Sequence, residues 1–321
     1  MIAVQGLTKR YGSIEAVKDV SFEVGKDQVL GFLGPNGAGK TTVMKILTGY
    51  HFPSEGTALV EGISVQENPV EVKRRIGYLP ESVPLYGDLT VDEYLSFIAD
   101  ARLIPHGGRN QAIEATLAAC GLEYMAGKRI ETLSKGYKQR VGLAQAIIHD
   151  PPILILDEPT TGLDPNQIIE IRSLIKDLGK RKTVILSTHI LQEVEAVCSQ
   201  VLIINEGRIA AQGRPEEIAG TMKGTDTWEL TLKGDGVQGI MERLSRLGVS
   251  LLPGTAEAEP DGTLTLSFAV MGGDNGTGTI DGERIFDWAV SEGLKILSMN
   301  RKKISLEDIF VKLTGEEEAS S

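Results

Sequence analysis

The sequence predicts an α/β fold with a parallel sheet at its centre, followed by a smaller α+β domain. Buried-strand patterns such as PPILILDEP and TVILSTH are joined by the helical stretch PNQIIEIRSLIKDLGKR. Buried strands that alternate with helices form parallel sheets covered by helices on both faces. The chain has 321 residues, whereas single hydrophobic cores usually stop growing at about 250 residues. We therefore expect two domains.

The first domain is expected to cover residues 1–220. Its opening third reads as short strands broken by turns, such as IAVQGLTKRYG and AVKDVSFEV, which predicts an antiparallel β subdomain. From about residue 88 to residue 150, apolar residues recur three and four positions apart. This spacing predicts a helical insert before the strands return.

A smaller domain is expected at residues 226–315, after a linker at residues 221–225 where the periodicity is lost. Its pattern of strand, helix, strand, strand, helix, strand is that of a split βαβ, or ferredoxin-like, domain. SLEDIFVKLTG predicts a closing helix capped by Ser305 and ended by Gly315. Residues 316–321 are expected to form a disordered tail. Nothing in this domain resembles a catalytic site, and we expect it to serve in homodimer contact or in regulation.

The stretch LGPNGAGKTT lies between a short apolar strand and a helix, and it matches G-x-x-x-x-G-K-T. Glycines allow the positive φ values at which successive N–H groups point into one concavity, which suits an anion. The start of the next helix adds its own unpaired N–H groups. An ordinary glycine-rich turn is the alternative, but every fixed position of the phosphate-binding loop is present. Gly34, Gly37 and Gly39 are expected at positive φ, Lys40 at the β and γ phosphates, and Thr41 on Mg²⁺. The nucleotide-binding residues predicted in this loop are Gly34, Pro35, Asn36, Gly37, Ala38, Gly39, Lys40, Thr41 and Thr42.

Two acidic residues follow the apolar run ILIL. Asp157 stands where the carboxyl end of a buried strand meets the phosphate loop, which predicts a Mg²⁺ ligand. Glu158 is next in line and is expected to orient or deprotonate an attacking water. A strand end with solvated carboxylates is the alternative, but two acids directly after four apolar residues are uncommon where they have no function.

Composition excludes several other classes. The chain carries 33 basic and 44 acidic residues, a net charge of −11, which argues against nucleic acid as the main partner. Cys120 and Cys198 are too few and too far apart for a disulfide framework or a metal site, and we expect buried, inert thiols. No secretory signal is visible, and the longest apolar runs fall far below the roughly 20 residues that span a bilayer. We expect a chain that is soluble by itself in a reducing cytoplasm.

A phosphate loop alone does not distinguish a kinase, a GTPase or a motor. Between the two motifs lies LSKGYKQR, in which Ser134 is expected to cap a helix. Taken in order with the phosphate loop and ILILDEP, this stretch resembles the signature of the ATP-binding cassette (ABC) family, whose usual form is LSGGQ. The resemblance covers roughly residues 1–220, and it implies a cassette of the P-loop NTPase type that binds and hydrolyses ATP.

Three shorter elements also resemble parts of that family. Tyr11 in KRYG resembles the aromatic residue that stacks on adenine, TTGLD ending at Asp164 resembles the D-loop, and His189 in ILSTH resembles the switch histidine. Each has a simpler reading: Tyr11 as a hairpin aromatic, His189 as the start of a helix, and Asp164 as a helix cap before Pro165. The cap is compatible with the family role.

The resemblance implies a homodimer. In this family two cassettes pack head to tail, so that ATP on the phosphate loop of one copy is closed by the signature helix of the other. Ser134 and Gly136 are therefore expected to meet the γ-phosphate across the interface, where a helix N-terminus favours an anion. Hydrolysis would remove that bridge and let the two copies separate.

Three residues depart from the family pattern. Glu81 in IGYLPE stands where the family has Gln, a residue that touches Mg²⁺ and water. We expect Glu81 to ligate the metal, at the cost of a negative charge near the triphosphate. Lys135 replaces a glycine of the signature and Tyr137 replaces its glutamine.

The function implied is that of an ATPase subunit that powers a separate multi-span permease from the cytoplasmic face of the membrane. RRIGYLPESVPLYGDLTVDEYL and LEDIFVKLTG resemble bacterial export-type cassettes, a group with drug, polysaccharide, copper-related and gliding-motility exporters. No residue here selects a cargo. One alternative is a non-transport cassette ATPase acting on DNA or ribosomes, although neither a second phosphate loop nor a sustained heptad is present. The other is a regulatory cassette with little hydrolysis, which Glu81 and Lys135 leave open.

Overall fold

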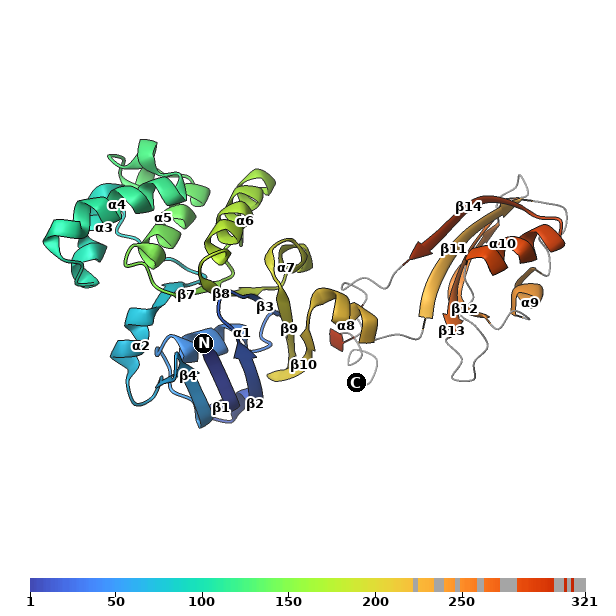
Figure 1. Ribbon diagram of the computed structural model, residues 1–321, viewed down its shortest axis with the longest axis horizontal. Coiled ribbons are helices and arrows are strands. Elements are labelled where there is room, and N and C mark those ends of the chain that lie inside the picture. Colours follow the sequence, from blue (N-terminus) through green and yellow to red (C-terminus); the bar gives the residue numbers. More distant parts are fainter. Residues whose placement is uncertain are drawn as a thin grey trace. The chain divides into compact units, whose positions relative to one another are not determined.

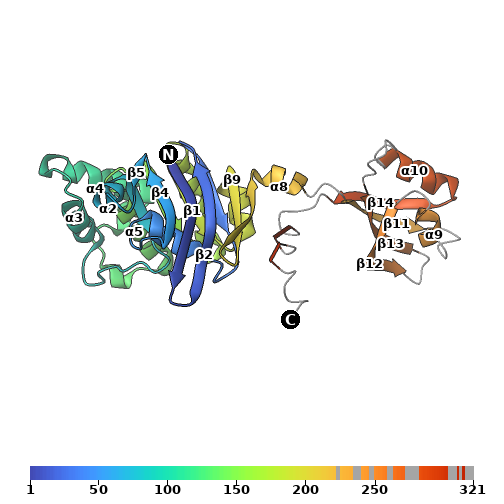
Figure 2. The same cartoon turned by 90° about the horizontal axis from the view of Figure 1, so that it is seen from below.

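The computed structural model describes residues 1–221, 225–233, 240–245, 249–258, 263–271, 282–302, 309–310 and 313–314. Contacts within the chain divide it into two compact units, and Figures 1 and 2 show the elements of each. Unit 1 comprises Met1–Pro215 with Leu313–Ser321, and unit 2 comprises Glu216–Lys312. The predicted domain limits and linker stay predictions, and residues 222–224 of that linker lie outside the described residues.

The centre of unit 1 is a sheet of six strands in which five run parallel and the edge strand β10 is antiparallel to β9. Its strands are all short, and β3 and β7 are buried along their whole length. Such strands are typical of parallel sheets covered on both faces, which confirms the predicted α/β core. In order across the sheet they are β10 (Arg208–Gly213), β9 (Gln200–Asn205), β3 (Val29–Leu33), β8 (Thr183–Thr188), β7 (Ile153–Asp157) and β6 (Ile76–Leu79).

A second sheet of unit 1 is antiparallel, as predicted for the opening third of the chain. Its strands β1 and β2 begin the chain, and residues along them alternate between buried and exposed over much of their length. Such alternation indicates strands with one face toward the core. The strand order is β2 (Ile14–Val24), β1 (Ile2–Tyr11), β4 (Glu55–Val60) and β5 (Ile63–Ser64).

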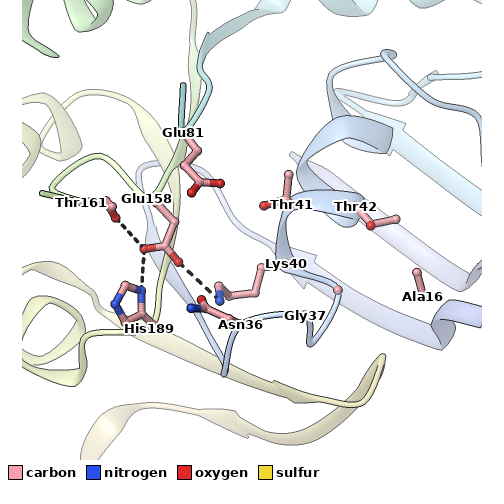
Figure 3. Close-up of a pocket in the computed structure, with 11 residues that line it drawn as sticks. Ala16, Asn36, Gly37, Lys40, Thr41, Thr42, Glu81, Glu158, Thr161 and His189 are labelled. Carbon is pink, nitrogen blue, oxygen red and sulfur yellow. Dashed lines mark hydrogen bonds and ion pairs between the residues drawn. The ribbon is translucent and has the colours of Figure 1, made fainter. Parts of the chain in front are cut away.

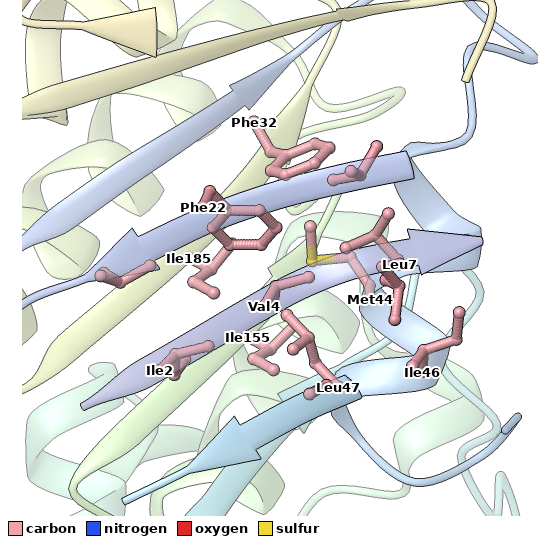
Figure 4. Packing of buried hydrophobic residues seen from close by; sticks show 14 of the residues in the cluster. Ile2, Val4, Leu7, Phe22, Phe32, Met44, Ile46, Leu47, Ile155 and Ile185 are labelled. Atoms are coloured by element: carbon pink, nitrogen blue, oxygen red, sulfur yellow. The ribbon is translucent and has the colours of Figure 1, made fainter. Parts of the chain in front are cut away.

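The two sheets enclose one hydrophobic core around helix α1 (Lys40–Leu47). Figure 4 shows Val4 of β1, Phe22 of β2 and Met44 of α1 in this core, together with Ile155 of β7. The other face of the parallel sheet, with Leu154 and Leu156 of β7, belongs to a second core formed with the helices. Because neighbouring residues of a strand point to opposite faces, β7 joins both cores and its end is held rigidly between them.

Helices occupy much of residues 88–150, the segment where a helical insert was predicted. Thr90 caps α3 through a capping box with Glu93, in which each side chain bonds the other residue's backbone N–H. Helix α2 and strand β6, just before the insert, were not predicted. The helices within Met1–Pro215 are α1 (Lys40–Leu47), α2 (Pro69–Arg75), α3 (Val91–Ala101), α4 (His106–Cys120), α5 (Lys135–Ile147), α6 (Pro165–Gly179) and α7 (Leu191–Val197), with short 3₁₀ turns at Glu123–Met125 and Ile130–Thr132.

Both cysteines are free thiols. Cys120 ends α4 in the helical core, and Cys198 follows α7 and is half-buried. Burial raises the pKa of each thiol to about 12. Thiols with so high a pKa are unreactive, which agrees with the prediction of inert cysteines.

The described residues of unit 2 form an antiparallel sheet in the order β12-β13-β11-β14. Helices α9 and α10 lie between its strands in the sequence, so the described elements follow the predicted order of strand, helix, strand, strand, helix, strand. Its core includes Trp228, Phe268 and Trp288. After α8 (Pro215–Thr221), the elements are β11 (Thr225–Lys233), α9 (Ile240–Ser245), β12 (Val249–Ala258), β13 (Thr263–Met271), α10 (Gly282–Ser291) and β14 (Lys295–Lys302).

Residues 309–310 and 313–314 are helical, in the segment where a closing helix was predicted. The Asn205 side-chain amide of unit 1 donates a hydrogen bond to the Leu313 carbonyl at 3.2 Å. The predicted cap Ser305, the predicted end Gly315 and the tail at residues 316–321 lie outside the described residues. Within the described part of the chain, no helix is both long enough and apolar enough to cross a membrane.

Candidate functional site

The phosphate loop leaves the carboxyl end of β3, which is flanked by the parallel neighbours β8 and β9. Gly37 and Gly39 have φ values of 83° and 107°, as predicted, and Gly39 is the residue from which α1 starts. Gly34 does not have a positive φ, so that part of the prediction is wrong. Glycine is required at this position by close packing instead, because a Cβ on Gly34 would overlap the Ile204 carbonyl oxygen of β9.

Lys40, the first residue of α1, points into the loop and is only 5% exposed. Its Nζ donates to the carbonyl oxygens of Gly34 at 2.8 Å and Pro35 at 3.1 Å. The same ammonium lies 3.4 Å from Oε1 of Glu158. A buried cation needs such partners, and here all three lie where a phosphate group is expected to bind.

Glu158 directly follows β7 and is almost fully buried. Its φ of 50° is uncommon for a residue with a side chain, and its N–H donates to the Ser187 carbonyl and hydroxyl oxygens at the end of β8. Its Oε2 accepts hydrogen bonds from Thr161 Oγ1 at 3.2 Å and from His189 Nδ1 at 2.8 Å, while Oε1 faces Lys40 (Figure 3). The carboxylate is therefore held on both of its oxygens.

His189 follows β8 and its side chain is 41% exposed, so it lies at the rim of the site. An ionised carboxylate can only accept a hydrogen bond, so the bond to Glu158 requires the proton on His189 Nδ1. In the neutral imidazole, Nε2 is then left as an acceptor. The pair thus fixes both the position and the tautomer of the imidazole.

Asp157 ends β7 with no solvent exposure. Its Oδ1 accepts hydrogen bonds from Ser187 Oγ and from Thr41 Oγ1, the latter at 3.3 Å, while its buried Oδ2 has no hydrogen-bond partner. Burial raises the pKa of this carboxyl above its ordinary value, although the two hydroxyl groups oppose the shift. A buried carboxylate oxygen without a partner is what a cation site requires.

These residues fit Mg²⁺ better than a metal held by protein alone. No group of three or more His, Cys, Asp or Glu side chains able to hold a metal occurs among the described residues. Mg²⁺ usually keeps several waters and binds one or two carboxylates plus substrate phosphates. Asp157 and Thr41 supply oxygen ligands of that kind, and Glu81 lines the same pocket.

The pocket formed here has a volume of about 390 Å³. Most of the predicted site residues line it, which brings together the phosphate loop, the end of β7 and the residue after β8 (Figure 3). Sequence reasoning missed Thr161 and Ala16, although Thr161 lies three residues after Glu158 in EPTT. The lining residues are Ala16, Asn36, Gly37, Gly39, Lys40, Thr41, Thr42, Glu81, Glu158, Thr161 and His189.

Three residues of the predicted loop lie behind this lining. Gly34 and Pro35 contribute their carbonyl oxygens to Lys40. Ala38 is buried, its N–H donates to the Pro35 carbonyl, and its own carbonyl accepts from the N–H of Gly207 between β9 and β10. These bonds fix the loop against the sheet.

Asp157 also lies outside the lining, and four further predicted residues come from other parts of the chain. Tyr11 is paired with Ile14 at the end of the β1–β2 hairpin, where its ring packs edge-on against His51. Asp164 caps α6, and its carboxylate accepts from the N–H of Gln167 at 3.0 Å. The predicted helix cap at Asp164 is confirmed.

The other two belong to the start of α5. Ser134 is exposed, and its hydroxyl accepts a long hydrogen bond of 3.5 Å from the N–H of Tyr137. Gly136 is buried, and a Cβ there would overlap the Gln167 side chain of α6. One chain therefore does not bring Ser134 and Gly136 to its own phosphate loop.

Comparison with known proteins agrees with this arrangement. The family model described as ABC transporter matches residues 17–161, and a model of an AAA domain matches residues 128–195. An uncharacterised ABC transporter ATP-binding protein, YxlF of Bacillus subtilis (strain 168), is 33% identical over 316 residues, which is 98% of this chain and 99% of the relative. The chain belongs to the ABC transporter family. It is an ATP-binding ATPase subunit of the kind that works with a membrane permease.

Two further ABC proteins are similar over much of the chain. The Nod factor export ATP-binding protein I of Ralstonia nicotianae is 32% identical, with 99% of this chain and 94% of the relative covered. A solved dimeric structure of the ATP-binding cassette MJ0796, in a post-hydrolysis state bound to ADP and Pi, has a TM-score of 0.61. That cassette is 25% identical and covers 67% of this chain and 98% of its own.

Two of the three departures of this ABC subunit from the family pattern, Glu81 and Lys135, line a second cavity of about 530 Å³. Glu81 and Thr161 line both cavities, whereas Lys135 lines only the second. The Lys135 ammonium lies over Gly162, where it takes the space that a Cβ would fill, and it makes no ion pair with any described residue. Tyr137 is half-buried against the helical core.

Proposed function

We propose that this chain hydrolyses ATP in the pocket at its phosphate loop, as one of two copies that drive a membrane exporter. The observation that carries the proposal is the position of Glu158, whose carboxylate lies between Lys40 and His189 in the same pocket as the loop. An ammonium group that can bind phosphate (Lys40), a carboxylate that can accept a proton from water (Glu158) and an imidazole (His189) are thus adjacent. These are the groups that phosphoryl transfer to water uses.

Lys40 changes partners in the proposed reaction. Its ammonium is bound to two carbonyl oxygens and to Glu158, and the β and γ phosphate oxygens of ATP carry more charge than those carbonyls. When the triphosphate takes this cation, Oε1 of Glu158 loses its partner and is free to accept a proton from water. The water oxygen bonds to the γ-phosphorus, the bond from phosphorus to the bridging oxygen of ADP breaks, and phosphate leaves with the proton returned to it.

Thr41, Asp157 and Glu81 are proposed to hold Mg²⁺. The bare Oδ2 of Asp157 and the Thr41 hydroxyl beside Oδ1 support this assignment. When bound, the metal would neutralise charge on the β and γ phosphates. In its absence, Asp157 keeps Thr41 and Ser187 in place.

Two copies are proposed to pack head to tail, with Ser134 and Gly136 of one copy against the nucleotide of the other. The exposure of Ser134 and the start of α5 at Lys135 support this, since a free helix N-terminus favours a phosphate. The dimeric state of the similar MJ0796 cassette also supports it. Tyr11 is proposed to stack on adenine, and Asp164 to lie at the dimer interface.

The direction of transport is proposed from similarity to the Nod factor export protein. In this proposal the chain lies at the cytoplasmic face of the membrane, bound to a multi-span permease that selects the cargo. Unit 2 is proposed to be a ferredoxin-like domain, because its described strands have the order β12-β13-β11-β14 with helices after the first and third strands of the chain order. Its proposed role is dimer contact or regulation.

The test is phosphate release by the purified full-length chain, alone and with the permease that co-purifies from membranes. Glu158→Gln keeps the size of the side chain and removes its basicity, so we expect a loss of about 100-fold or more with ATP binding retained. Glu195→Gln, on the exposed face of α7, is the matched control and should retain the wild-type rate. Equal rates in Glu158→Gln and wild type would remove Glu158 as the base and contradict the proposal.

A further inference from the structure

Glu193 is a buried carboxylate that the proposed mechanism does not use. It lies in the first turn of α7 and is 1% exposed. Its Oε1 accepts a hydrogen bond from Thr160 Oγ1, and its Oε2 accepts one from Thr188 Oγ1 at 2.8 Å. Arg172 Nη2 lies 3.7 Å from Oε1. Burying a charge is costly unless it is paired and hydrogen-bonded, and Glu193 has a partner in each of three segments.

The first partner belongs to the loop that carries the proposed base. Thr160 is two residues after Glu158, and the next residue, Thr161, donates its own hydroxyl to Oε2 of Glu158. The bond from Thr160 to Glu193 therefore fixes the loop directly beside the hydrogen bond that orients the base.

The second partner borders the imidazole. Thr188 immediately precedes His189, and its hydroxyl donates to Glu193 while it accepts from the N–H of Ile190 at 3.0 Å. The Thr188 hydroxyl thus accepts from the backbone N–H of Ile190, on the other side of His189, and its own bond to Glu193 fixes its orientation. His189 therefore lies between Thr188 and Ile190, which are joined by a hydrogen bond.

The third partner extends the network to α6. Arg172 lies on that helix, which packs against α7 and is capped by Asp164. Glu193 therefore connects the loop after β7, the residue after β8 and the helix that follows the TTGLD stretch. None of its three partners lines the pocket, but Thr160 and Thr188 are each next in sequence to a residue that does, Thr161 and His189.

We propose that Glu193 is a positioning residue for ATP hydrolysis, which keeps Glu158 and His189 at their mutual distance by holding Thr160 and Thr188. The inference rests on the proposed roles of Glu158 and His189. It differs from a purely structural role for Glu193, in which a buried acid only offsets the charge of Arg172. Positioning predicts a loss in kcat with binding intact, since the hydrogen bonds and ion pair of Glu193 run to Thr160, Thr188 and Arg172 and not to the phosphate loop.

The test uses two matched sets of full-length variants. Glu193→Gln keeps the volume of the side chain and removes its charge, and Glu195→Gln on the exposed face of α7 is its control. Thr188→Val removes the hydroxyl and keeps the shape, whereas Thr188→Ser keeps the hydroxyl. We expect Glu193→Gln and Thr188→Val to lower kcat about 10- to 100-fold, as is usual when groups that orient a catalytic residue are removed. The KM for ATP and the melting temperature should change little, and Thr188→Ser should retain activity.

A double variant separates positioning from general damage. In the background of His189→Ala, Glu193→Gln should lower kcat much less than it does in the wild type, because part of what it positions is gone. An undiminished further loss would overturn the proposal. So would an unchanged kcat in Glu193→Gln, or a loss of kcat in Glu193→Gln and Thr188→Val matched by loss of ATP binding or of the fold.

Failure of this inference is distinguishable from failure of the proposed function. If Glu158→Gln is inactive and Glu193→Gln has the wild-type rate, only the positioning role is wrong. If Glu158→Gln itself has the wild-type rate, the proposed chemistry is wrong whatever Glu193→Gln does.

Discussion

The phosphate loop and the start of α5 carry the two most specific motifs of the chain, and their side chains are held in opposite ways. Lys40 is buried and has three partners within its own chain. Ser134 is exposed, and its hydroxyl makes only a 3.5 Å capping bond among the described residues. The cation of the loop is already held in place without a ligand, whereas the polar side chain at the start of α5 is exposed to solvent.

Under the proposed function, this difference corresponds to two unlike halves of a site within a single chain. The half at the loop combines Lys40, Glu158 and His189 in one pocket. The half at α5 lies beside the second cavity, with Lys135 at its edge. Under the proposed function, the second half is completed only by nucleotide bound to another copy.

The largest expected effect comes from separating these halves by mutation. Lys40→Ala removes the phosphate cation, and Ser134→Glu places a negative charge where phosphate is proposed to bind, so each alone should lower ATP hydrolysis about 100-fold or more. Mixing the two variants gives dimers with one intact site. Random pairing makes half of the dimers mixed, and each of these has one intact site of two, so about a quarter of the wild-type rate should return.

The measurement is phosphate release as the ratio of the two variants is changed. A maximum at equal amounts supports a site shared between copies. A rate that stays flat at every ratio contradicts it, provided that both variants remain folded.

The next largest effect concerns how the loop is held against the sheet. Gly34→Ala would drive a Cβ into the Ile204 carbonyl oxygen and should lower the free energy of unfolding by about 2 to 3 kcal/mol. Gly37→Ala meets no atom within 4 Å but has a φ of 83°, which should cost about 1 kcal/mol. Urea denaturation of the nucleotide-free chain compares the pair, and a greater loss for Gly37→Ala would contradict this account.

A smaller effect is expected at Asp157. Its folded pKa is raised by burial, so its favourable contribution exists below the unfolded pKa of about 3.9 and is lost as pH rises through the folded value. At pH 7 the ionised group therefore destabilises the metal-free fold. Asp157→Asn should raise its melting temperature by about 2 to 4 °C, which corresponds to roughly 1 kcal/mol.

The gain should shrink as the pH approaches 4, because the wild-type carboxyl then becomes neutral as well. Magnesium and nucleotide should stabilise the wild type more than Asp157→Asn. Melting curves across this pH range check both statements, and a lower melting temperature for Asp157→Asn at pH 7 would contradict the first.

The smallest effect is expected on the α5 side. Ser134→Ala removes a long capping bond and should lower the free energy of unfolding by only about 0.5 kcal/mol, whereas Asp164→Ala removes a 3.0 Å cap and should cost about 1 kcal/mol. Urea denaturation measures both. A larger loss for Ser134→Ala would mean that its own chain uses this hydroxyl more than the structure indicates.

The core of the fold and most of the pocket were predictable because their signals are local. Four consecutive apolar residues before Asp157 indicate a buried strand, and the glycine spacing before Lys40 indicates an anion loop. The contact that constrains Gly34 comes from Ile204, about 170 residues away along the chain, so sequence spacing could not reveal it.

Glu193 was missed for a different reason. In THILQEVE it reads as an ordinary charged residue near the start of a helix, and Glu195 in the same stretch is indeed exposed. What distinguishes Glu193 from Glu195 is that Thr160, Thr188 and Arg172 surround its carboxylate in the folded chain. A partial signal was present, since Thr188 ends an apolar strand directly before His189.

The bond from Asn205 to Leu313 has a consequence for how this chain can be shortened. Leu313 is grouped with unit 1 although unit 2 precedes it along the chain, so in sequence unit 2 lies between two segments of unit 1. A chain shortened to end before unit 2 would therefore also lack a segment of unit 1. A shortened protein that keeps all of unit 1 would need unit 2 removed and the segments on either side of it joined, so that Leu313 is retained.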